Sequence, residues 1–193
     1  MSSNIGVMGH PIGHTKSPIF QQTGLNELGI DETFEAWDVL PEDLEDKVAT
    51  FREKGFIAAC VTLPHKQAVI PMVDELTEAA ESVGAVNWIF NRDGKLIGHN
   101  TDCNGFLRAL KEKAGFDPKG ADAVVFGAGG AARAIVYALK TAGVNRLTIA
   151  NRTVEKAQAL ANDFSEGRFK PTATGMSRDE LSNYVPYANL LVN

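Results

Sequence analysis

The first hundred residues alternate between short apolar runs and longer stretches with apolar residues at helical spacing. These patterns predict strands at 5–9, 33–39, 56–63, 85–90 and 95–98, and helices at 17–29, 41–54 and 74–82. Ser17 and Pro18 suit the N-cap and the first position of the first helix. The alternation implies a mainly parallel sheet covered by helices, and the Asp93-Gly94 step predicts a hairpin that adds one antiparallel strand.

A predicted helix at residues 102–114 leads into a second α/β pattern. This pattern predicts strands at 123–126, 146–150 and 188–193, and helices at 131–142, 153–164 and 177–184, with Thr153 as an N-cap. The chain therefore divides into a domain over residues 1–102 and a domain over residues 103–193. The second pattern ends on a strand without a helix to cover it, which indicates an incomplete domain.

A glycine-rich turn joins the first strand and the first helix of the second domain. It reads Gly127-Ala128-Gly129-Gly130-Ala131-Ala132. The first glycine permits a tight turn, the second lets the backbone approach a pyrophosphate, and the small Ala132 lets helix and strand pack closely. The free N–H groups at the start of the helix then face the phosphates. Because a strand precedes the turn and a helix follows it, the turn predicts a Rossmann-type domain that binds a dinucleotide.

The end of the next strand distinguishes NADP from NAD. Enzymes that use NAD usually place Asp or Glu there, for the ribose 2′-hydroxyl. This chain instead has Asn151-Arg152-Thr153, with Lys156 one turn into the helix. Two cations and no carboxylate suit a 2′-phosphate, so NADP is the predicted cofactor. The alternative is that Arg152 and Lys156 are ordinary solvated surface charges.

Composition and charge exclude several classes of protein. The net charge of −5 argues against a nucleic acid or an anionic membrane as partner. The two cysteines, Cys60 and Cys103, form neither a disulfide framework nor a zinc motif, and no metal is expected. Residues 1–4 show no targeting signal and no apolar run is long enough to span a membrane, so we expect a cytoplasmic protein. We further expect it to be a monomer or a homodimer.

Polar residues gather where the strands of the first domain end. They are Thr15 and Ser17 after the first strand, Thr62 and Lys66 after the third, Asn87 within the next, and Asp102 after the hairpin. Strand ends of a parallel sheet converge on one crevice, so hydroxyls, an amide and a Lys/Asp pair together suit a polyhydroxylated small molecule. The pair could transfer a proton, although a lysine and an aspartate also form ordinary salt bridges.

Six motifs, in order, resemble those of the shikimate dehydrogenase family over essentially the whole chain. They are Gly9-His10-Pro11-Ile12-Gly13-His14-Thr15-Lys16-Ser17-Pro18, Val61-Thr62-Leu63-Pro64-His65-Lys66, Gly84-Ala85-Val86-Asn87, Gly98-His99-Asn100-Thr101-Asp102, the glycine turn with Arg133-Ala134, and Asn151-Arg152-Thr153. The resemblance implies a substrate domain before the NADP domain. It also implies reduction of 3-dehydroshikimate to shikimate with NADPH, on the route to aromatic amino acids.

The resemblance assigns roles by position. It implies that Lys66 and Asp102 are the catalytic pair, while Thr15, Ser17, Thr62 and Asn87 join them in holding the substrate. It further implies that Glu78 lies near the nicotinamide. Lys66 would donate a proton to the carbonyl oxygen, or stabilise its charge, while Asp102 orients the group.

Four positions depart from the usual pattern of the family. Thr15 replaces a usual Ser, Cys60 an Asn, Trp88 a Thr and Cys103 a Gly. The extra methyl group of Thr15 could shift preference toward quinate, and Trp88 could equally be a core residue. The alternatives are therefore a quinate or aminoshikimate dehydrogenase of the same superfamily, or a non-catalytic NADP-binding regulatory paralogue.

Overall fold

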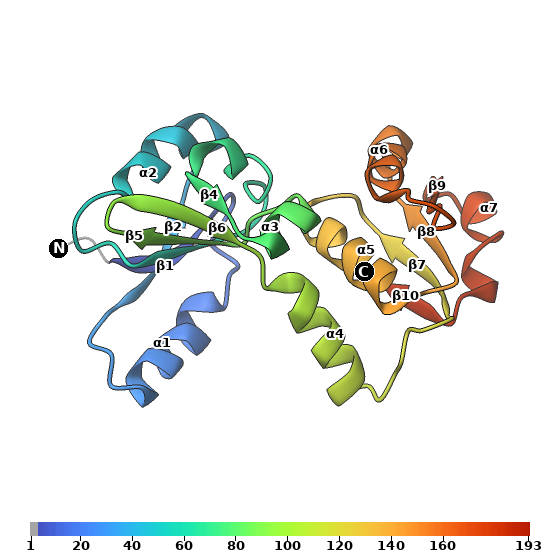
Figure 1. The fold of residues 1–193 in the computed structure, drawn as a ribbon, viewed down its shortest axis with the longest axis horizontal. Helices are drawn as coiled ribbons and strands as arrows, with labels where there is room; N and C mark the ends of the chain where they lie inside the picture. Colours follow the sequence, from blue (N-terminus) through green and yellow to red (C-terminus); the bar gives the residue numbers. More distant parts are fainter. Residues whose placement is uncertain (1–3) are drawn as a thin grey trace. The chain divides into compact units, whose positions relative to one another are not determined.

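The computed structural model describes residues 4–193. The prediction that residues 1–4 carry no targeting signal therefore falls mostly outside the described residues. The chain forms two compact units, Met1–Thr101 and Asp102–Asn193 (Figure 1). This division falls one residue before the boundary expected from the sequence. That the first unit holds the substrate and the second the cofactor remains a prediction.

The first unit is built on a six-stranded sheet in the order β2-β1-β3-β5-β6-β4. Its strands are β1 (Ile5–Gly9), β2 (Phe34–Asp38), β3 (Ala58–Val61), β4 (Glu75–Leu76), β5 (Trp88–Arg92) and β6 (Lys95–His99). Only β5 runs against its neighbours, as the predicted hairpin requires. Asp93 and Gly94 form its turn with φ angles of 54° and 85°, the left-handed pair that a tight two-residue turn needs.

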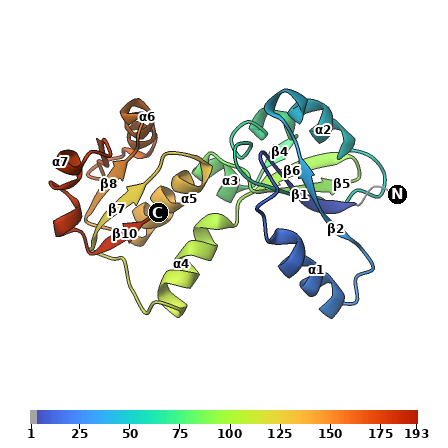
Figure 2. The same ribbon diagram turned by 180° about the vertical axis from the view of Figure 1, so that it is seen from behind.

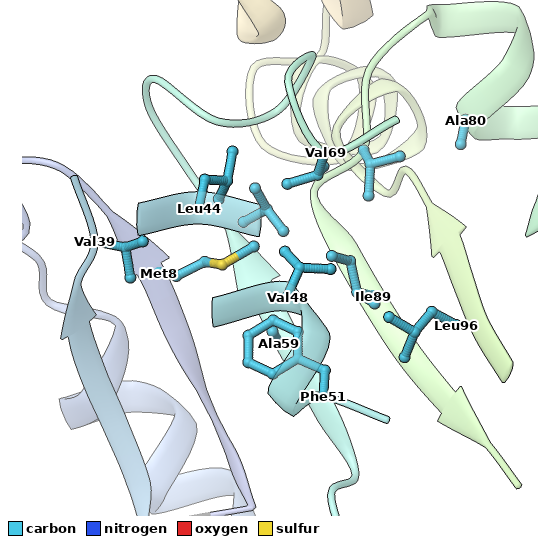
Figure 3. Packing of buried hydrophobic residues seen from close by; sticks show 12 residues of the cluster. Met8, Val39, Leu44, Val48, Phe51, Ala59, Val69, Ala80, Ile89 and Leu96 are labelled. Carbon is cyan, nitrogen blue, oxygen red and sulfur yellow. The ribbon is translucent and has the colours of Figure 1, made fainter. Parts of the chain in front are cut away.

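Helices cover both faces of this sheet (Figures 1 and 2). They are α1 (Ser17–Glu27), α2 (Leu44–Thr50), α3 (Glu78–Val83) and the short 3₁₀ turns η1 (Pro41–Asp43) and η2 (Ile70–Met72). Side chains alternate along β1, so Met8 packs in the core beside α2 while Val7 packs in the cluster that includes Leu25 of α1. Figure 3 shows the larger core, which includes Phe51, Val48 and Ala59.

Three local predictions for the first unit were wrong. The N-cap of α1 is Lys16 rather than Ser17, because Ser17 already has helical geometry. The helix expected over 41–54 is η1 followed by α2, which ends at Thr50. The helix expected over 74–82 begins later, because Glu75 and Leu76 pair with β6 as strand β4. The Oγ1 of Thr77 then accepts from Ala80 N and caps α3.

The second unit has a four-stranded parallel sheet in the order β10-β7-β8-β9. Its strands are β7 (Asp122–Phe126), β8 (Arg146–Ala150), β9 (Thr172–Thr174) and β10 (Leu190–Val192). The chain moves outward from β7 through β8 to β9 and then returns to the other side of β7. This reversal is the strand order of a Rossmann-type nucleotide-binding half, and it confirms the predicted fold class. Strand β9 was not predicted.

Two amphipathic helices cover one face of the second sheet. The helices of this unit are α4 (Asp102–Glu112), α5 (Gly130–Ala142), α6 (Val154–Phe164), α7 (Arg178–Leu181) and the 3₁₀ turn η3 (Val185–Tyr187). Val136 of α5 and Leu160 of α6 share one buried cluster with Val125 of β7 and Ile149 of β8.

Within residues 4–193, no helix combines the length and apolar character needed to cross a membrane.

Candidate active site

Backbone hydrogen bonds link the strand ends of the first unit along one edge of its sheet. Thr62 N donates to Met8 O over 2.9 Å, and His10 N donates to Leu63 O over 3.0 Å. Val61 N donates to Asn87 O over 2.8 Å. Because β5 is antiparallel, its beginning lies beside the end of β3, and this brings Asn87 to the edge where Thr62 stands. The structure therefore places the loops that carry Thr62 and Asn87 together, as the sequence predicts.

Gly9 lets the first two of these loops approach each other. A Cβ at this position would lie 2.5 Å from Thr62 Cγ2 and 2.8 Å from Leu63 O. Contacts this short do not occur between real Cβ atoms and their neighbours, so a larger residue would push the 62–66 loop away. Because Gly9 has no side chain, the 62–66 loop can lie close to the end of β1.

We expect Gly9→Ala to lower the free energy of unfolding by about 1–3 kcal/mol, as overpacking does in other cores. The matched control is Gly13→Ala, because a Cβ there would meet nothing within 4 Å. Urea denaturation of the two variants measures the difference. Equal stability of the two variants would contradict the close approach at Gly9.

The loop that carries Lys66 is held on both sides. His65 is buried, with 1% of its surface exposed, and its Nε2–H donates to Val39 O over 2.7 Å. Val86 N donates to Lys66 O over 2.7 Å, which ties the loop to the segment that precedes Asn87. The half-buried Lys66 therefore extends from a backbone anchored to the end of β2 on one side and to the start of β5 on the other.

Asn87 binds the residue that precedes Asp102. Its side chain is buried, its Nδ2 donates to Thr101 Oγ1 over 2.8 Å, and its Oδ1 accepts from Thr101 N over 3.0 Å. Asn100 is also buried, and its Nδ2 donates to Ala85 O over 2.9 Å. These bonds fix the end of the first unit, and Asp102 follows directly as the first residue of α4. The sequence did not predict that Asn87 would hold Thr101.

Thr15 and Ser17 form a small hydroxyl pair where α1 begins. Thr15 Oγ1 lies 3.2 Å from Ser17 Oγ and accepts from Ser17 N, also over 3.2 Å. Thr15 N donates to Ile12 O over 2.9 Å, which closes the turn between β1 and the helix. The two half-buried hydroxyls are thus held side by side. Two donor/acceptor groups at this spacing can bind adjacent oxygens of one small molecule.

The residues that depart from the family pattern differ in their surroundings. Cys60 and Trp88 are paired across β3 and β5 and pack against the small cluster around Val7, which supports a packing role for Trp88. Trp88 also stacks on Phe90 with ring centroids 6.1 Å apart. Cys103 is buried in α4, and this burial raises the pKa of its thiol. A raised pKa keeps the thiol protonated at neutral pH and therefore a poor nucleophile.

Two further histidines of the motifs form hydrogen bonds with different partners. His10 Nδ1 donates to Asp38 Oδ1 over 2.9 Å, and His99 Nδ1 lies 2.8 Å from Thr77 Oγ1. His14 is exposed. Across residues 4–193, no three His, Cys, Asp or Glu side chains are grouped so that they could hold a metal ion.

The glycine turn of the second unit has the geometry expected of a phosphate-binding loop. Gly127 has a φ of 110°, which favours glycine, and Gly127 N donates to Ala150 O over 2.8 Å. A Cβ at either Gly127 or Gly129 would meet nothing within 4 Å, so the space above the turn is open. Gly129 is the N-cap of α5, and the N–H groups of its first turn, at Gly130, Ala131 and Ala132, have no partners within the helix.

Ala132 is 6% exposed and packs in the cluster that contains Ala123 and Val125 of β7. The small side chain lets α5 lie close to the strand. A pyrophosphate would fit the open backbone above the turn, at the carboxyl end of the strand where the sheet order reverses. The residues present therefore fit a dinucleotide.

Exposed cations follow the end of β8. Arg152 and Lys156 are both exposed, and Asn151 Nδ2 donates to Thr153 O over 2.8 Å, which shapes the turn before α6. Thr153 is the N-cap of α6 by position, but its side chain makes no capping hydrogen bond. Glu78, the remaining residue expected near the cofactor, is exposed in the first turn of α3 in the first unit.

Comparison with known proteins identifies the same two parts of the chain. Residues 7–89 match the family model "Shikimate dehydrogenase substrate binding domain", and residues 109–192 match "Shikimate / quinate 5-dehydrogenase". A protein of Methanopyrus kandleri named shikimate dehydrogenase (NADP(+)) is 44% identical over 190 residues, which are 98% of this chain and 66% of that relative. The chain thus spans slightly less than two thirds of that relative's length.

Two solved structures of shikimate 5-dehydrogenase from Thermus thermophilus have a similar fold. One, in complex with shikimate, has a TM-score of 0.82 at 37% identity and covers 98% of this chain and 67% of its own. The other, in complex with NADP(H) and shikimate, has a TM-score of 0.77 at 36% identity and covers 90% of this chain and 68% of its own. On these matches of sequence and fold, the chain belongs to the shikimate dehydrogenase family.

Proposed function

We propose that the protein is a cytoplasmic, NADP-dependent shikimate dehydrogenase that reduces 3-dehydroshikimate to shikimate in aromatic amino acid biosynthesis. The observation that carries this proposal is the Lys66 loop, anchored beside the Asn87 segment in the first unit. The second unit contributes an open glycine turn and two exposed cations after β8. The relative named shikimate dehydrogenase (NADP(+)) and the Thermus complexes with shikimate and NADP(H) support it further.

The substrate is a ring with several hydroxyls and a carboxylate, and the first unit offers matching groups. We assign the contacts with its oxygens to Thr15, Ser17, Thr62 and Asn87. The paired hydroxyls of Thr15 and Ser17 suit adjacent oxygens, because each hydroxyl both donates and accepts. Thr62 lies on the loop that packs closely against Gly9, so contacts at the edge of the sheet fix its position.

Lys66 and Asp102 are assigned the proton transfer. When bound, NADPH supplies a hydride to the carbonyl carbon of the substrate. The carbonyl oxygen then gains negative charge, and the ammonium group of Lys66 donates a proton to it. Asp102 orients that ammonium group, and its own place is set by Thr101, which Asn87 holds through two hydrogen bonds.

The cofactor is assigned to the second unit. The backbone of Gly127, Ala128, Gly129, Gly130 and Ala131 would hold the pyrophosphate, because the N–H groups of the first turn of α5 favour anions. Asn151, Arg152, Thr153 and Lys156 would surround the 2′-phosphate of the adenosine ribose. Glu78 is proposed to approach the nicotinamide.

The direct test supplies purified protein with 3-dehydroshikimate and NADPH and follows the loss of NADPH absorbance, with mass spectrometry of the product. We expect shikimate to form in equal amount to the NADPH that is consumed. Tight binding of NADPH without turnover of any cyclohexene or cyclohexane polyol would contradict the proposal and favour a regulatory NADP-binding protein.

A further inference from the structure

A cavity of about 400 Å³ lies in the second unit, at the end of the sheet opposite to the glycine turn. It is lined where β7, β8 and β9 begin, at Asp122, Arg146 and Thr172, and by residues of the 168–170 and 183–188 segments. The glycine turn follows the other end of β7. At ~3.3 Å per residue, Asp122 and Gly127 are roughly 16 Å apart along the strand. The cavity is therefore separate from the cofactor site proposed above.

The charged side chains around this cavity are mostly cationic. Asp122 is the only acidic residue among those that line it, and its carboxylate accepts from Arg146 and, over 2.9 Å, from Asn145 Nδ2. The Arg146 guanidinium lowers the pKa of the Asp122 carboxyl, so this acid stays ionised and remains paired. Two further cations, Arg168 and Lys170, line the cavity and form no ion pair with any residue in 4–193.

Aromatic residues complete the lining. Tyr184, which is half-buried, and Tyr187, which is 69% exposed, reach the cavity from the segment that leads into β10. Thr148 of β8 is buried and also lines it. Small-molecule sites commonly measure about 300–1,000 Å³ and combine apolar or aromatic walls with a few charged groups. The cavity has this size, but its lining is more polar than that of most such sites, which suits a charged ligand.

We propose that this cavity is a second ligand site, which binds a small organic anion with a carboxylate or phosphate group attached to a ring. Arg168 and Lys170 bind the anionic group, because neither of these exposed cations forms an ion pair with a residue in 4–193. The ring packs against the tyrosines, whose faces are apolar and whose hydroxyls stay in contact with water. The ligand is expected to bind whether or not NADP occupies the cofactor site.

Titration of the ¹⁵N-labelled chain with phenyl phosphate, followed by NMR, tests the proposal. We expect saturable shifts at the amides of Thr148, Arg168, Lys170 and Tyr184, in the absence of NADP⁺ and equally at saturating NADP⁺. Benzyl alcohol, which has the ring without the charge, is expected to cause no saturable shift. Loss of the phenyl phosphate shifts on addition of NADP⁺ would overturn the proposal, because the probe would then occupy the cofactor site.

A pair of variants locates the anion. Arg168→Gln combined with Lys170→Gln is expected to weaken phenyl phosphate binding at least roughly 10-fold, since two charge-assisted hydrogen bonds are lost. Lys113→Gln removes an exposed cation that does not line the cavity, and is expected to leave the affinity unchanged. Equal weakening in both variants would overturn the assignment. Because the readout is binding in the second unit, the test does not depend on dehydrogenase activity.

Discussion

Lys66→Ala is expected to lower kcat for shikimate oxidation by about 10²–10⁴-fold, the range that general acid–base groups contribute. The affinity for NADP⁺ should change little, because the glycine turn belongs to the second unit and Lys66 to the first. Steady-state kinetics and NADP⁺ titration, carried out on the same preparation, measure both quantities.

Two further variants separate the charge of Lys66 from its bulk. Lys66→Met keeps most of the length of the side chain and is expected to lose as much activity as Lys66→Ala. Lys54→Ala removes an exposed lysine in the same unit and should keep full activity. A Lys66→Ala variant that turns over at the normal rate would remove Lys66 from the proposed proton transfer.

Combining Arg152→Ala with Lys156→Ala is expected to raise KM for NADP⁺ by about 10²-fold or more. Each hydrogen bond to a charged group contributes about 1.5–3 kcal/mol, and both cations are assigned to the 2′-phosphate. KM for NAD⁺, which lacks that phosphate, should change by less than about 3-fold, within the effect of lost surface charge.

The control for this variant combines Lys113→Ala with Lys119→Ala, two exposed lysines at a distance in sequence from the β8 turn. It should leave both KM values unchanged. If the Arg152/Lys156 variant kept its normal KM for NADP⁺, these residues would be the ordinary solvated charges that the sequence also allowed.

Most elements with a strong local pattern were predicted from the sequence. The spans of β1 and β8 match, and the Asp93-Gly94 turn has the predicted left-handed geometry. Strand β9 was missed because Thr172–Thr174 is only three residues long, with a single apolar residue, and takes strand geometry from its pairing with β8. Strand β4 was missed for the same reason, since its two residues take strand geometry from their pairing with β6. Tertiary pairing determines these elements, and local preference does not.

The candidate site was likewise predictable only in part. The residue types and their order along the chain were sufficient to single out Lys66 and the glycine turn. The support around them was not predictable, because the partners are distant in sequence. His65 binds Val39, which is 26 positions away, and Asn87 binds Thr101, which is 14 positions away. Only the folded sheet edge brings those pairs together.

The proposed function requires this chain to prefer shikimate as substrate and NADP as cofactor. The most direct measurement compares kcat/KM for shikimate and quinate, each with NADP⁺ and with NAD⁺, in one preparation. We expect the highest value for shikimate with NADP⁺. A higher kcat/KM for quinate would instead point to the quinate alternative that Thr15, Cys60 and Trp88 suggest, and a preference for NAD⁺ would contradict the role given to Arg152 and Lys156.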